Sequence, residues 1–326
     1  MVLKSGDILK DRYKIERFIN QGGMGNIFQA EDLRLEGRQC AVKEIRLDTS
    51  LPEKTISQSR EQFKKEATVL ARLDHANLPK VSDFFSEGQS DFLVMDFVPG
   101  EDLRTKMIKA RQRKEFLDER DVLKWAQQLA DALIYLHSQD PPILHRDIKP
   151  GNLKITPNGV LKLVDFGLVK IMAPEDATIT VIQGRGTALY TPIEQYGGDT
   201  GHTDVRSDIY SFGATLYHLV TNQPPFEARE LFLKPNSLPS ILGFNDKISP
   251  RTARAIEWAM SLHPDQRPDT VLAFRDALFG DWNPNSRLSA VLPPPTFADV
   301  INTKEERRLL WAATGLLLIS LITVLN

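Results

Sequence analysis

The sequence predicts an α+β protein of two lobes. Up to about residue 98, short runs rich in β-branched and aromatic residues alternate with turns, as strands do: YKIERFI, NIFQAED, RQCAVKEI, KVSDFF and FLVMDFV. Pro99 and Gly100 then break the pattern, and the chain becomes mainly helical. We therefore expect a small β-rich lobe at residues 1–98 and a larger helical lobe at residues 99–282, with a ligand site in the cleft between them.

The small lobe is expected to contain one main helix. Between residues 61 and 73, apolar side chains recur on one helical face, at Phe63, Ala67, Leu70 and Ala71. The remaining apolar runs of this lobe are too short for helices of ordinary length, so we assign them to strands.

The large lobe shows three helix patterns. One is an apolar stripe with helical spacing, formed by Val122, Trp125, Ala126, Leu129, Leu133 and Leu136. A second is Ile209–Val220, which is apolar nearly all round, as a helix in the middle of a core would be. The third opens at Ser249-Pro250, a cap followed by a first-turn proline.

Composition is that of an ordinary globular protein. The chain has 326 residues, 41% of them apolar and 26% charged. Its net charge of −2 argues against a general electrostatic grip on nucleic acid, so we expect no nucleic-acid partner. Cys40 is the single cysteine, which fits a reducing compartment. The opening MVLKSGDILK lacks the long apolar core of a signal peptide.

The C-terminal part predicts a membrane anchor. Residues 283–308, with NPNSRLS and LPPPT, have the composition of a linker. The seventeen residues Leu309–Leu325 carry no charge, and Arg307 and Arg308 directly precede them. Basic residues on that flank favour a single-pass helix in the inner, cytoplasmic membrane with the preceding chain in the cytoplasm. The alternative is a buried helix packed on the domain.

A glycine cluster lies near the start, in FINQGGMGNIF. It is either a tight turn between two strands or a loop that covers phosphate. The phosphate reading needs Gly22, Gly23 and Gly25, but a full G-x-G-x-x-G would also need glycine where this chain has Asn20. Asparagine tolerates left-handed backbone angles better than most residues, so the loop conformation could survive.

Three further motifs decide the question. AVKEI contains Lys43, HRDIKPGN spans His145–Asn152 and VDFG spans Val164–Gly167. In this order they resemble the protein kinase family over about residues 13–279, and HRDIKPGN followed by DFG is highly specific. The wording of QGGMG and HRDIKPGN, with the predicted membrane segment, is most similar to bacterial transmembrane serine/threonine kinases. The resemblance implies the two-lobed protein kinase fold, with ATP as phosphoryl donor.

The resemblance also implies roles for the motif residues. Phosphoryl transfer depends on positioning and charge neutralisation more than on covalent chemistry. Lys43 would bind the α- and β-phosphates, and Glu66, in FKKEATVLARLDHANLP, would orient it; Glu61 and Glu53 are rival partners. Asp147 would be the catalytic base.

The remaining loop residues complete this set. Lys149 would contact the γ-phosphate, while Asn152 and Asp165 would supply oxygen ligands for Mg²⁺ or Mn²⁺. The alternative for Asp147 and Asp165 is a turn or cap residue. His145 is expected to be structural rather than catalytic.

The nucleotide pocket follows from the same resemblance. Its lid would be Ile19, Asn20 and the glycines Gly22, Gly23 and Gly25, and its roof Ile27 and Ala41. Met95 would close the back, with Asp96 to Val98 as the hinge between the lobes. Lys154 falls where the family has an apolar floor for adenine, and its methylenes could serve if the ammonium reaches outward.

Three residues match supporting positions of the family. Glu194 and Arg267 would form a buried ion pair under the substrate-binding segment, and Asp208 would hold the catalytic-loop backbone. The alternatives are that Asp208 only caps a helix and that Arg267 is a surface arginine.

The function expected from these residues is an ATP-dependent serine/threonine kinase acting on proteins. HRDIK and Thr187 favour Ser/Thr substrates. Thr178 and Thr180 are expected sites of autophosphorylation, and Arg146 is expected to bind the phosphate. A membrane-tethered pseudokinase and a small-molecule phosphotransferase are the alternatives. Expected partners are protein substrates and membrane lipid, and a homodimer is left open.

Overall fold

A computed structural model of the chain describes residues 3–22, 25–46, 52–165, 188–196, 203–234 and 237–280. Several predicted features lie outside these residues: Gly23, the threonines Thr178, Thr180 and Thr187, the linker 283–308 and the segment 309–325. Within the described ranges no helix is long and apolar enough to span a membrane.

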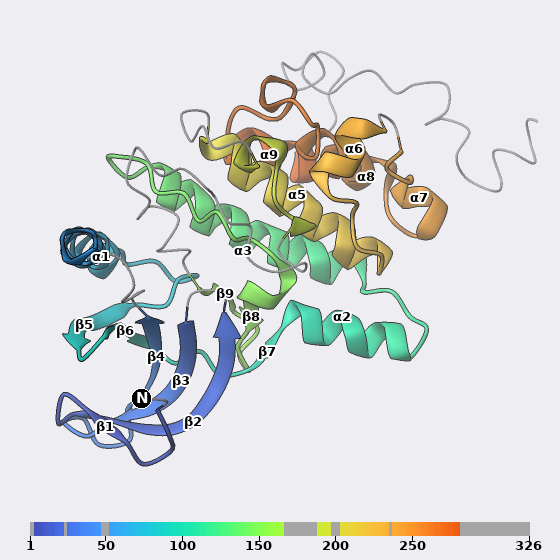
Figure 1. The fold of residues 1–326 in the computed structure, drawn as a ribbon. Helices are drawn as coiled ribbons and strands as arrows, with labels where there is room; N and C mark the ends of the chain where they lie inside the picture. Colours follow the sequence, from blue (N-terminus) through green and yellow to red (C-terminus); the bar gives the residue numbers. More distant parts are fainter. Residues whose placement is uncertain are drawn as a thin grey trace, which may run out of the picture.

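The small lobe is built on an antiparallel sheet with the described strand order β1-β2-β3-β4-β6-β5 (Figure 1). The strands are β1 (Ile8–Leu9), β2 (Tyr13–Gly22), β3 (Gly25–Asp32), β4 (Gln39–Arg46), β5 (Val81–Glu87) and β6 (Ser90–Asp96). Every second residue of β3 is buried, as expected for a strand with one face on the core. β4 is buried almost throughout, because it lies between β3 and β6 with apolar side chains on both faces.

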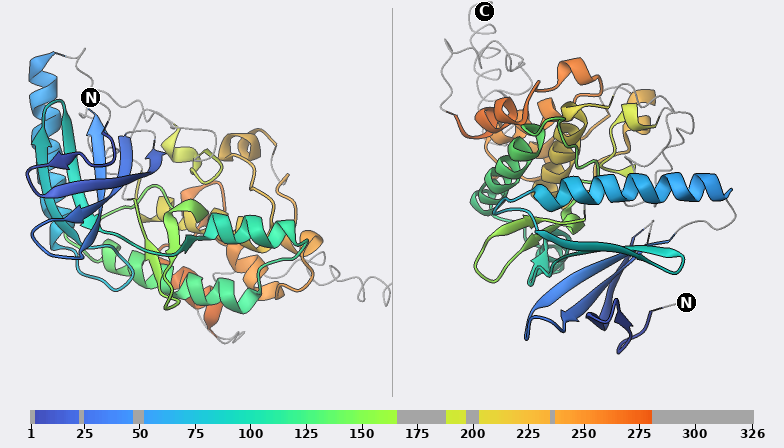
Figure 2. Two further views of the ribbon diagram at one scale, coloured as in Figure 1. Left: turned by 90° about the horizontal axis from the view of Figure 1, so that it is seen from below. Right: turned by 90° about the vertical axis from the view of Figure 1, so that its left-hand side faces the viewer.

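The main helix of this lobe, α1 (Glu53–Arg72), begins earlier than predicted. It buries Phe63, Glu66, Ala67 and Leu70, at the spacing of a single helical face. The face packs against β5 and β6, where the Phe63 and Phe84 rings meet edge to face at 6.4 Å (Figure 2). The first turns are exposed or half-buried and polar, so they lack the apolar repeat that predicts a helix.

The other face of the sheet carries a second, smaller core. Its members are Leu9, Tyr13, Ile15, Phe28, Ala30, Cys40, Val42, Phe92 and Val94. Cys40 is 1% exposed, and its thiol donates to the Ala30 carbonyl at 3.3 Å. Burial raises the pKa of this thiol to about 11.

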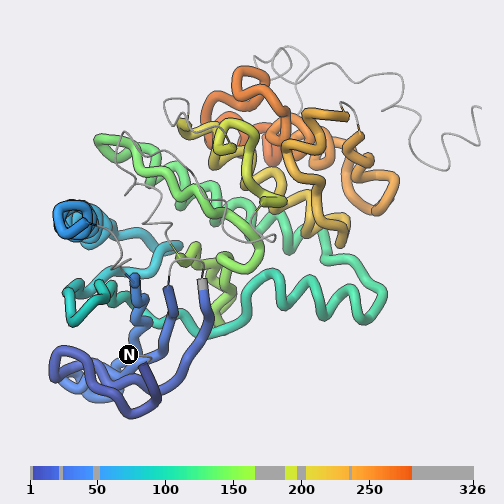
Figure 3. The backbone as a smooth tube through the Cα atoms, in the orientation of Figure 1, coloured from blue at the N-terminus to red at the C-terminus, as the bar shows by residue number. Residues whose placement is uncertain are grey.

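The chain crosses to the large lobe between β6 and β7 (Glu101–Asp102), in the segment that contains Pro99 and Gly100 (Figure 3). Gly100 has φ +104°, and a Cβ there would lie 2.0 Å from the Ile155 carbonyl oxygen. Only glycine fits this crossing, because both the backbone angle and the close approach exclude a side chain.

The large lobe surrounds a buried central helix, α5 (Val205–Thr221), which contacts α3, α7, α8 and α9. Its other helices within the described residues are α2 (Leu103–Gln112), α3 (Glu119–His137), α6 (Ala228–Leu233), α7 (Ile241–Phe244), α8 (Pro250–Ala259) and α9 (Val271–Phe279). Short elements are β8 (Leu153–Ile155), β9 (Leu161–Leu163) and the 3₁₀ turns η1 (Pro150–Asn152), η3 (Ile193–Gln195) and η5 (Pro264–Gln266). The predicted apolar stripe is the buried face of α3, and Ser249 caps α8 as predicted.

Candidate active site

The loop between α3 and β8 brings three predicted residues together. The Lys149 ammonium donates to both carboxylate oxygens of Asp147, at 3.0 and 2.9 Å. The Asn152 amide donates to the backbone carbonyl of Asp147 at 2.8 Å and to Asp147 Oδ2 at 3.0 Å. Asp147 is therefore a carboxylate held in place from two sides, and its role as a base stays a prediction.

Asp208 fixes the backbone that carries this loop. Its carboxylate accepts from the backbone N–H groups of His145 and Arg146, both at 2.8 Å, and lies 3.0 Å from His137 Nε2. Burial raises the pKa of Asp208, but His137 and these donors outweigh it and leave the pKa lowered. Asp204, and not Asp208, caps α5, so the predicted role of Asp208 is confirmed. His145 is buried, in line with a structural residue.

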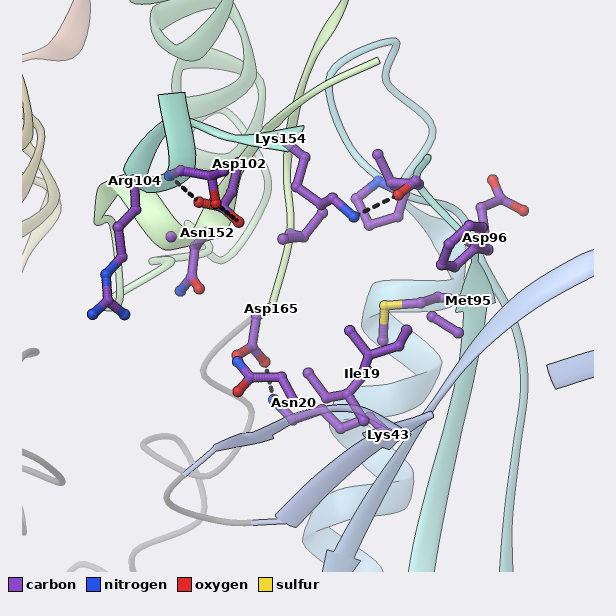
Figure 4. A pocket seen from close by; sticks show the side chains of 18 of the residues that line it. Ile19, Asn20, Lys43, Met95, Asp96, Asp102, Arg104, Asn152, Lys154 and Asp165 are labelled. Carbon is purple, nitrogen blue, oxygen red and sulfur yellow. Dashed lines mark hydrogen bonds and ion pairs between the residues drawn. The ribbon is translucent and has the colours of Figure 1, made fainter. Parts of the chain in front are cut away.

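Asp165 lies opposite this loop and forms an ion pair with Lys43 (Figure 4). Its φ of +64° is uncommon for a residue other than glycine. Burial raises the pKa of the Asp165 carboxyl, but the charge and hydrogen bond of Lys43 more than offset this, so the pKa lies below its usual range. The carboxylate therefore stays charged and available to a cation.

Glu66 differs from its prediction. It was expected to orient Lys43, yet in the described residues no ion pair joins the two, and Glu66 Oε1 accepts from Gln62 Nε2 at 2.8 Å instead. Its other oxygen, Oε2, is buried with no hydrogen-bond partner among the described residues. Burial raises the pKa of Glu66 to about 7, although the Gln62 hydrogen bond and the charge of Arg146 act the other way. Lys43 thus pairs with Asp165, and Glu66 is buried without an ion pair among the described residues to offset its burial.

A pocket of about 430 Å³ lies between the two lobes. It is lined by most of the residues predicted for a nucleotide: Ile19, Asn20, Ile27, Ala41, Lys43, Met95, Asp96, Val98, Asn152, Lys154 and Asp165. Figure 4 shows Lys43 and Asp165 at one end, with Met95 and Asp96 nearer to Lys154. One cavity thus contains both the apolar side chains and the charged candidates for binding phosphate.

The glycine cluster joins two strands of the sheet, with Gly22 paired to Gly25. A Cβ on Gly25 would lie 1.6 Å from the Glu44 carbonyl oxygen, so this glycine is needed for strand packing. Asn20 is extended within β2 and is not among the described residues with positive φ, so the left-handed tolerance invoked for it is not used. The hairpin itself is confirmed, and the role of its tip stays a prediction.

Sequence reasoning missed several lining residues: Pro79, Asp102, Arg104, Thr105, Ile108, Gly151 and Val164. Asp102 is the most informative, because its carboxylate caps α2 by accepting from the Thr105 N–H at 2.8 Å. Its position just after Pro99-Gly100, at the start of a helix, was the signal that could have identified it.

The predicted ion pair between Glu194 and Arg267 is present and buried. The two side chains pair through both terminal nitrogens of the guanidinium, Nη1 and Nη2, at 2.7 and 2.9 Å. The Arg267 side chain is 0% exposed and also donates to the carbonyls of Ser261, Arg206 and Leu262. This excludes a surface arginine.

Asn152 and Asp165 fit a divalent cation that is shared with phosphate. The Asn152 amide nitrogen is bound to Asp147, which leaves its oxygen as the ligand atom, and the Asp165 carboxylate lines the same pocket. No cluster of three His, Cys, Asp or Glu side chains occurs in the described residues. Two oxygens plus phosphate and water are the ligand set that Mg²⁺ commonly takes.

Comparison with known proteins identifies the class of protein. Residues 13–290 match the family described as protein kinase domain. The chain therefore belongs to the protein kinase family, which the two lobes and the Asp147 loop had indicated.

The individual relatives show which protein kinases the chain resembles. The chain is 36% identical over 228 residues to the serine/threonine-protein kinase PknA of Mycobacterium tuberculosis, covering 68% of this chain and 49% of the relative. It is 36% identical over 225 residues to PknB of Bifidobacterium longum, described as a probable serine/threonine-protein kinase, covering 66% and 31%. The predicted resemblance to bacterial serine/threonine kinases is confirmed. The chain spans about a third to a half of the length of these relatives.

Solved structures agree on the fold. The structure titled PpkA-294 apo form has a TM-score of 0.67 at 26% identity, covering 85% of this chain and 99% of that one. The kinase domain of PknI from Mycobacterium tuberculosis has a TM-score of 0.64 at 24% identity, with 85% and 98% covered. These values confirm the two-lobed protein kinase fold.

Proposed function

We propose that this chain is an ATP-dependent serine/threonine protein kinase that uses Mg²⁺. One observation carries the proposal: Asp147, held by Lys149 and Asn152, lies beside a pocket that also contains the Lys43–Asp165 pair. A base, a cation for phosphate and two candidate metal ligands are what phosphoryl transfer requires.

The proposed reaction uses these side chains in turn. A protein hydroxyl placed against Asp147 gives its proton to the carboxylate as its oxygen bonds to the γ-phosphorus of ATP. The bond from that phosphorus to the β–γ bridging oxygen breaks, and ADP leaves. Mg²⁺ held by Asn152 and Asp165 would neutralise phosphate charge, and Lys149 would steady the transferred group.

The direct test is to incubate the full chain with labelled ATP and Mg²⁺ and a mixture of protein substrates. Mass spectrometry should find phosphate on serine and threonine, and Asp147→Asn should remove it. Binding of ATP without transfer would favour the pseudokinase, and phosphorylation of small molecules alone would favour the phosphotransferase.

We also propose that residues 309–325 anchor the chain in the cytoplasmic membrane. The support is the uncharged run with two arginines before it. A chain cut after Asn302 should move to the soluble fraction, whereas recovery of the full chain there without detergent would contradict the anchor.

A third proposal is that the kinase phosphorylates its own Thr178 and Thr180. Its support is Arg146, next to the catalytic candidate Asp147, since arginine binds phosphate through paired hydrogen bonds. Changing both threonines to alanine should lower activity several-fold, and Arg146→Ala should make the enzyme insensitive to that change. An equally active double variant would exclude this switch.

A further inference from the structure

Two exposed arginines lie on one face of helix α2 and have no partner there. Arg104 and Arg111 are separated by two helical turns, about 10 Å along the axis. Ile108 lies between them on this face, and Ile108 and Arg104 line the pocket between the lobes together with Asn152 (Figure 4). Within the described part of the chain, neither arginine has an ion pair or a side-chain hydrogen bond. Both guanidinium groups are therefore available to a bound molecule.

Two other basic side chains near the end of this helix are paired, in contrast. Lys109 forms an ion pair with Glu101, and Arg113, the C-terminal cap of α2, pairs with Glu115 at 2.9 Å. These two cations have their counter-charges within the chain, so they provide a comparison for the unpaired face.

The charges of the two arginines act on a contact between Tyr190 and His218. The Tyr190 hydroxyl lies 2.6 Å from His218 Nδ1. Burial, and then the charges of Arg111 and Arg104, lower the pKa of His218 to about 4, so the imidazole is neutral at pH 7. Burial raises the pKa of Tyr190, and the charge of Arg104 opposes this. No carboxylate of the described residues contributes to either shift, so the field at the two rings is positive.

Helix α5 holds Tyr190 and the Asp147 loop side by side. The Ser211 hydroxyl donates to the Tyr190 carbonyl at 2.8 Å. One turn further along, the Thr215 hydroxyl donates to the carbonyl of Ile148, the residue that follows Asp147, at 3.3 Å. A protein chain whose hydroxyl reaches Asp147 therefore passes close to the region on which the two arginines act.

The carboxylates around this region do not neutralise the arginines. Those in or beside the pocket have other partners: Asp102 with Thr105, Asp147 with Lys149 and Asp165 with Lys43. Glu227 and Glu230 of α6 line a different pocket, beside Leu189. A negative charge for the arginines would therefore come from a bound molecule.

We propose that Arg104 and Arg111 are specificity-determining residues that bind acidic side chains of the protein substrate. The kinase then favours serine and threonine in acidic segments. This inference rests on the proposed function, since it assumes that a protein hydroxyl reaches Asp147. Arginine binds a carboxylate through paired hydrogen bonds, and two exposed contacts of this kind together favour an acidic substrate by about fivefold.

The distance between the two arginines also limits the substrate. An extended chain advances about 3.3–3.6 Å per residue, so about three residues span the two sites. Two acidic residues separated by about this number can therefore contact both arginines, and they should lie within a few residues of the phosphorylated one.

The test measures kcat/KM of the full chain on peptides that contain one threonine. Each of the four positions on either side of the threonine is in turn Glu, Gln or Lys. We expect Glu to exceed Gln by about fivefold in kcat/KM over the best pair of positions, and Lys to be the poorest. The preference should decrease at about 1 M salt, which screens exposed charges.

Paired variants identify the source of the preference. Arg104→Gln with Arg111→Gln should bring the ratio of Glu to Gln peptides close to one, and Arg104→Glu with Arg111→Glu should make Lys the favoured residue. The control is Lys109→Gln with Arg113→Gln, which removes the same charge from the same helix and should keep the preference of the unmodified chain.

Each result bears on the inference. No preference for Glu in the unmodified chain, or the same preference in both double arginine variants, overturns the inference and leaves the proposed function in place. A Gln double variant that raises KM for ATP but keeps the peptide ratio also overturns it, because Arg104 would then serve the nucleotide. If proteins are phosphorylated and these peptides are not, the mapped sites decide, and a lack of enrichment in Asp and Glu around them overturns the inference. Phosphorylation of neither peptides nor proteins overturns the proposed function as well.

Discussion

Asp147 shows how much of the site is encoded locally. Its partners Lys149 and Asn152 lie two and five residues along the chain, so the motif HRDIKPGN carries the whole cluster with it. These residues could be predicted because the geometry of one short loop, and not the fold, brings them together.

Asp147→Asn should lower phosphoryl transfer by about 10²–10⁴-fold, since asparagine cannot take the proton of the hydroxyl. ATP affinity should stay nearly unchanged, because Asp147 does not line the pocket. Single-turnover kinetics and calorimetry measure the two quantities separately.

The control is Asp131→Asn, which alters a surface carboxylate on α3. Turnover of Asp147→Asn near that of this control would show that the base has been assigned wrongly.

Other residues could not be predicted from motifs, because their partners come from distant segments. Lys43 pairs with Asp165, not Glu66, and this depends on where α1 docks on the sheet. The Lys154 amine donates to the Val98 carbonyl, 56 residues away in the sequence. A sequence gives the candidates for such contacts but not the choice among them.

At the scale of elements, the packing of strand β3 on strand β4 depends on one glycine. Gly25→Ala would place a methyl group 1.6 Å from the Glu44 carbonyl oxygen, where only backbone movement can make room. We expect this variant to lose about 1–3 kcal/mol in the free energy of unfolding, measured with urea.

Gly243→Ala is the matched comparison, because a Cβ at this position would meet nothing within 4 Å and its φ is not positive. It should be neutral. A Gly25→Ala variant as stable as Gly243→Ala would mean that strands β3 and β4 are not in this close contact.

Helix α1 carries a carboxyl group whose burial links stability to pH. With its pKa raised to about 7, Glu66 holds a proton in the folded protein over a range in which the unfolded chain has lost it. The folded state binds more protons between about pH 4.5 and 7, so this group makes stability fall as pH rises through that window.

Glu66→Gln removes this dependence while keeping the shape of the side chain. As the pH rises from 5 to 8, the free energy of unfolding of the variant should therefore increase by about 2–3 kcal/mol relative to that of the unmodified chain. Urea unfolding of both proteins at the two pH values tests this, and a difference that does not change with pH would contradict the raised pKa.

The boundaries of elements follow the same rule as the contacts. The part of α1 that packs on the sheet was predicted from Phe63, Ala67 and Leu70, whereas its exposed first turns were missed. Helix α5 was predicted from its apolar run, Ile209–Val220, and its first turn was missed although Ser207 and Asp208 are buried. The apolar pattern indicates where apolar side chains are buried, so a polar first turn is not predicted by it.

At the scale of the whole molecule, the Glu194–Arg267 pair ties segments far apart in the sequence. Arg267→Met would leave the Glu194 carboxylate buried and its neighbouring carbonyls without a donor. We expect a loss of about 3–5 kcal/mol in the free energy of unfolding.

Arg275→Met provides the comparison, since Arg275 pairs with Asp131 at the surface and should matter by less than about 1 kcal/mol. Similar losses for the two variants would refute a special role for the buried pair. Combining Arg267→Met with Glu194→Leu should recover part of the loss, because no charge is then left buried.

The buried thiol of Cys40 offers a way to measure how often the small lobe opens. It is the one cysteine of the chain, it is 1% exposed, and its pKa of about 11 keeps the reactive thiolate scarce. A thiol reagent can therefore modify the protein only while strands β3 and β4 are separated by local unfolding. The labelling rate therefore measures how often this opening occurs. Ala41 and Lys43, for which contacts with ATP are proposed, lie on the same strand as Cys40. ATP at a hundred times its dissociation constant should therefore lower the labelling rate about a hundredfold, because the nucleotide stabilises the closed strands.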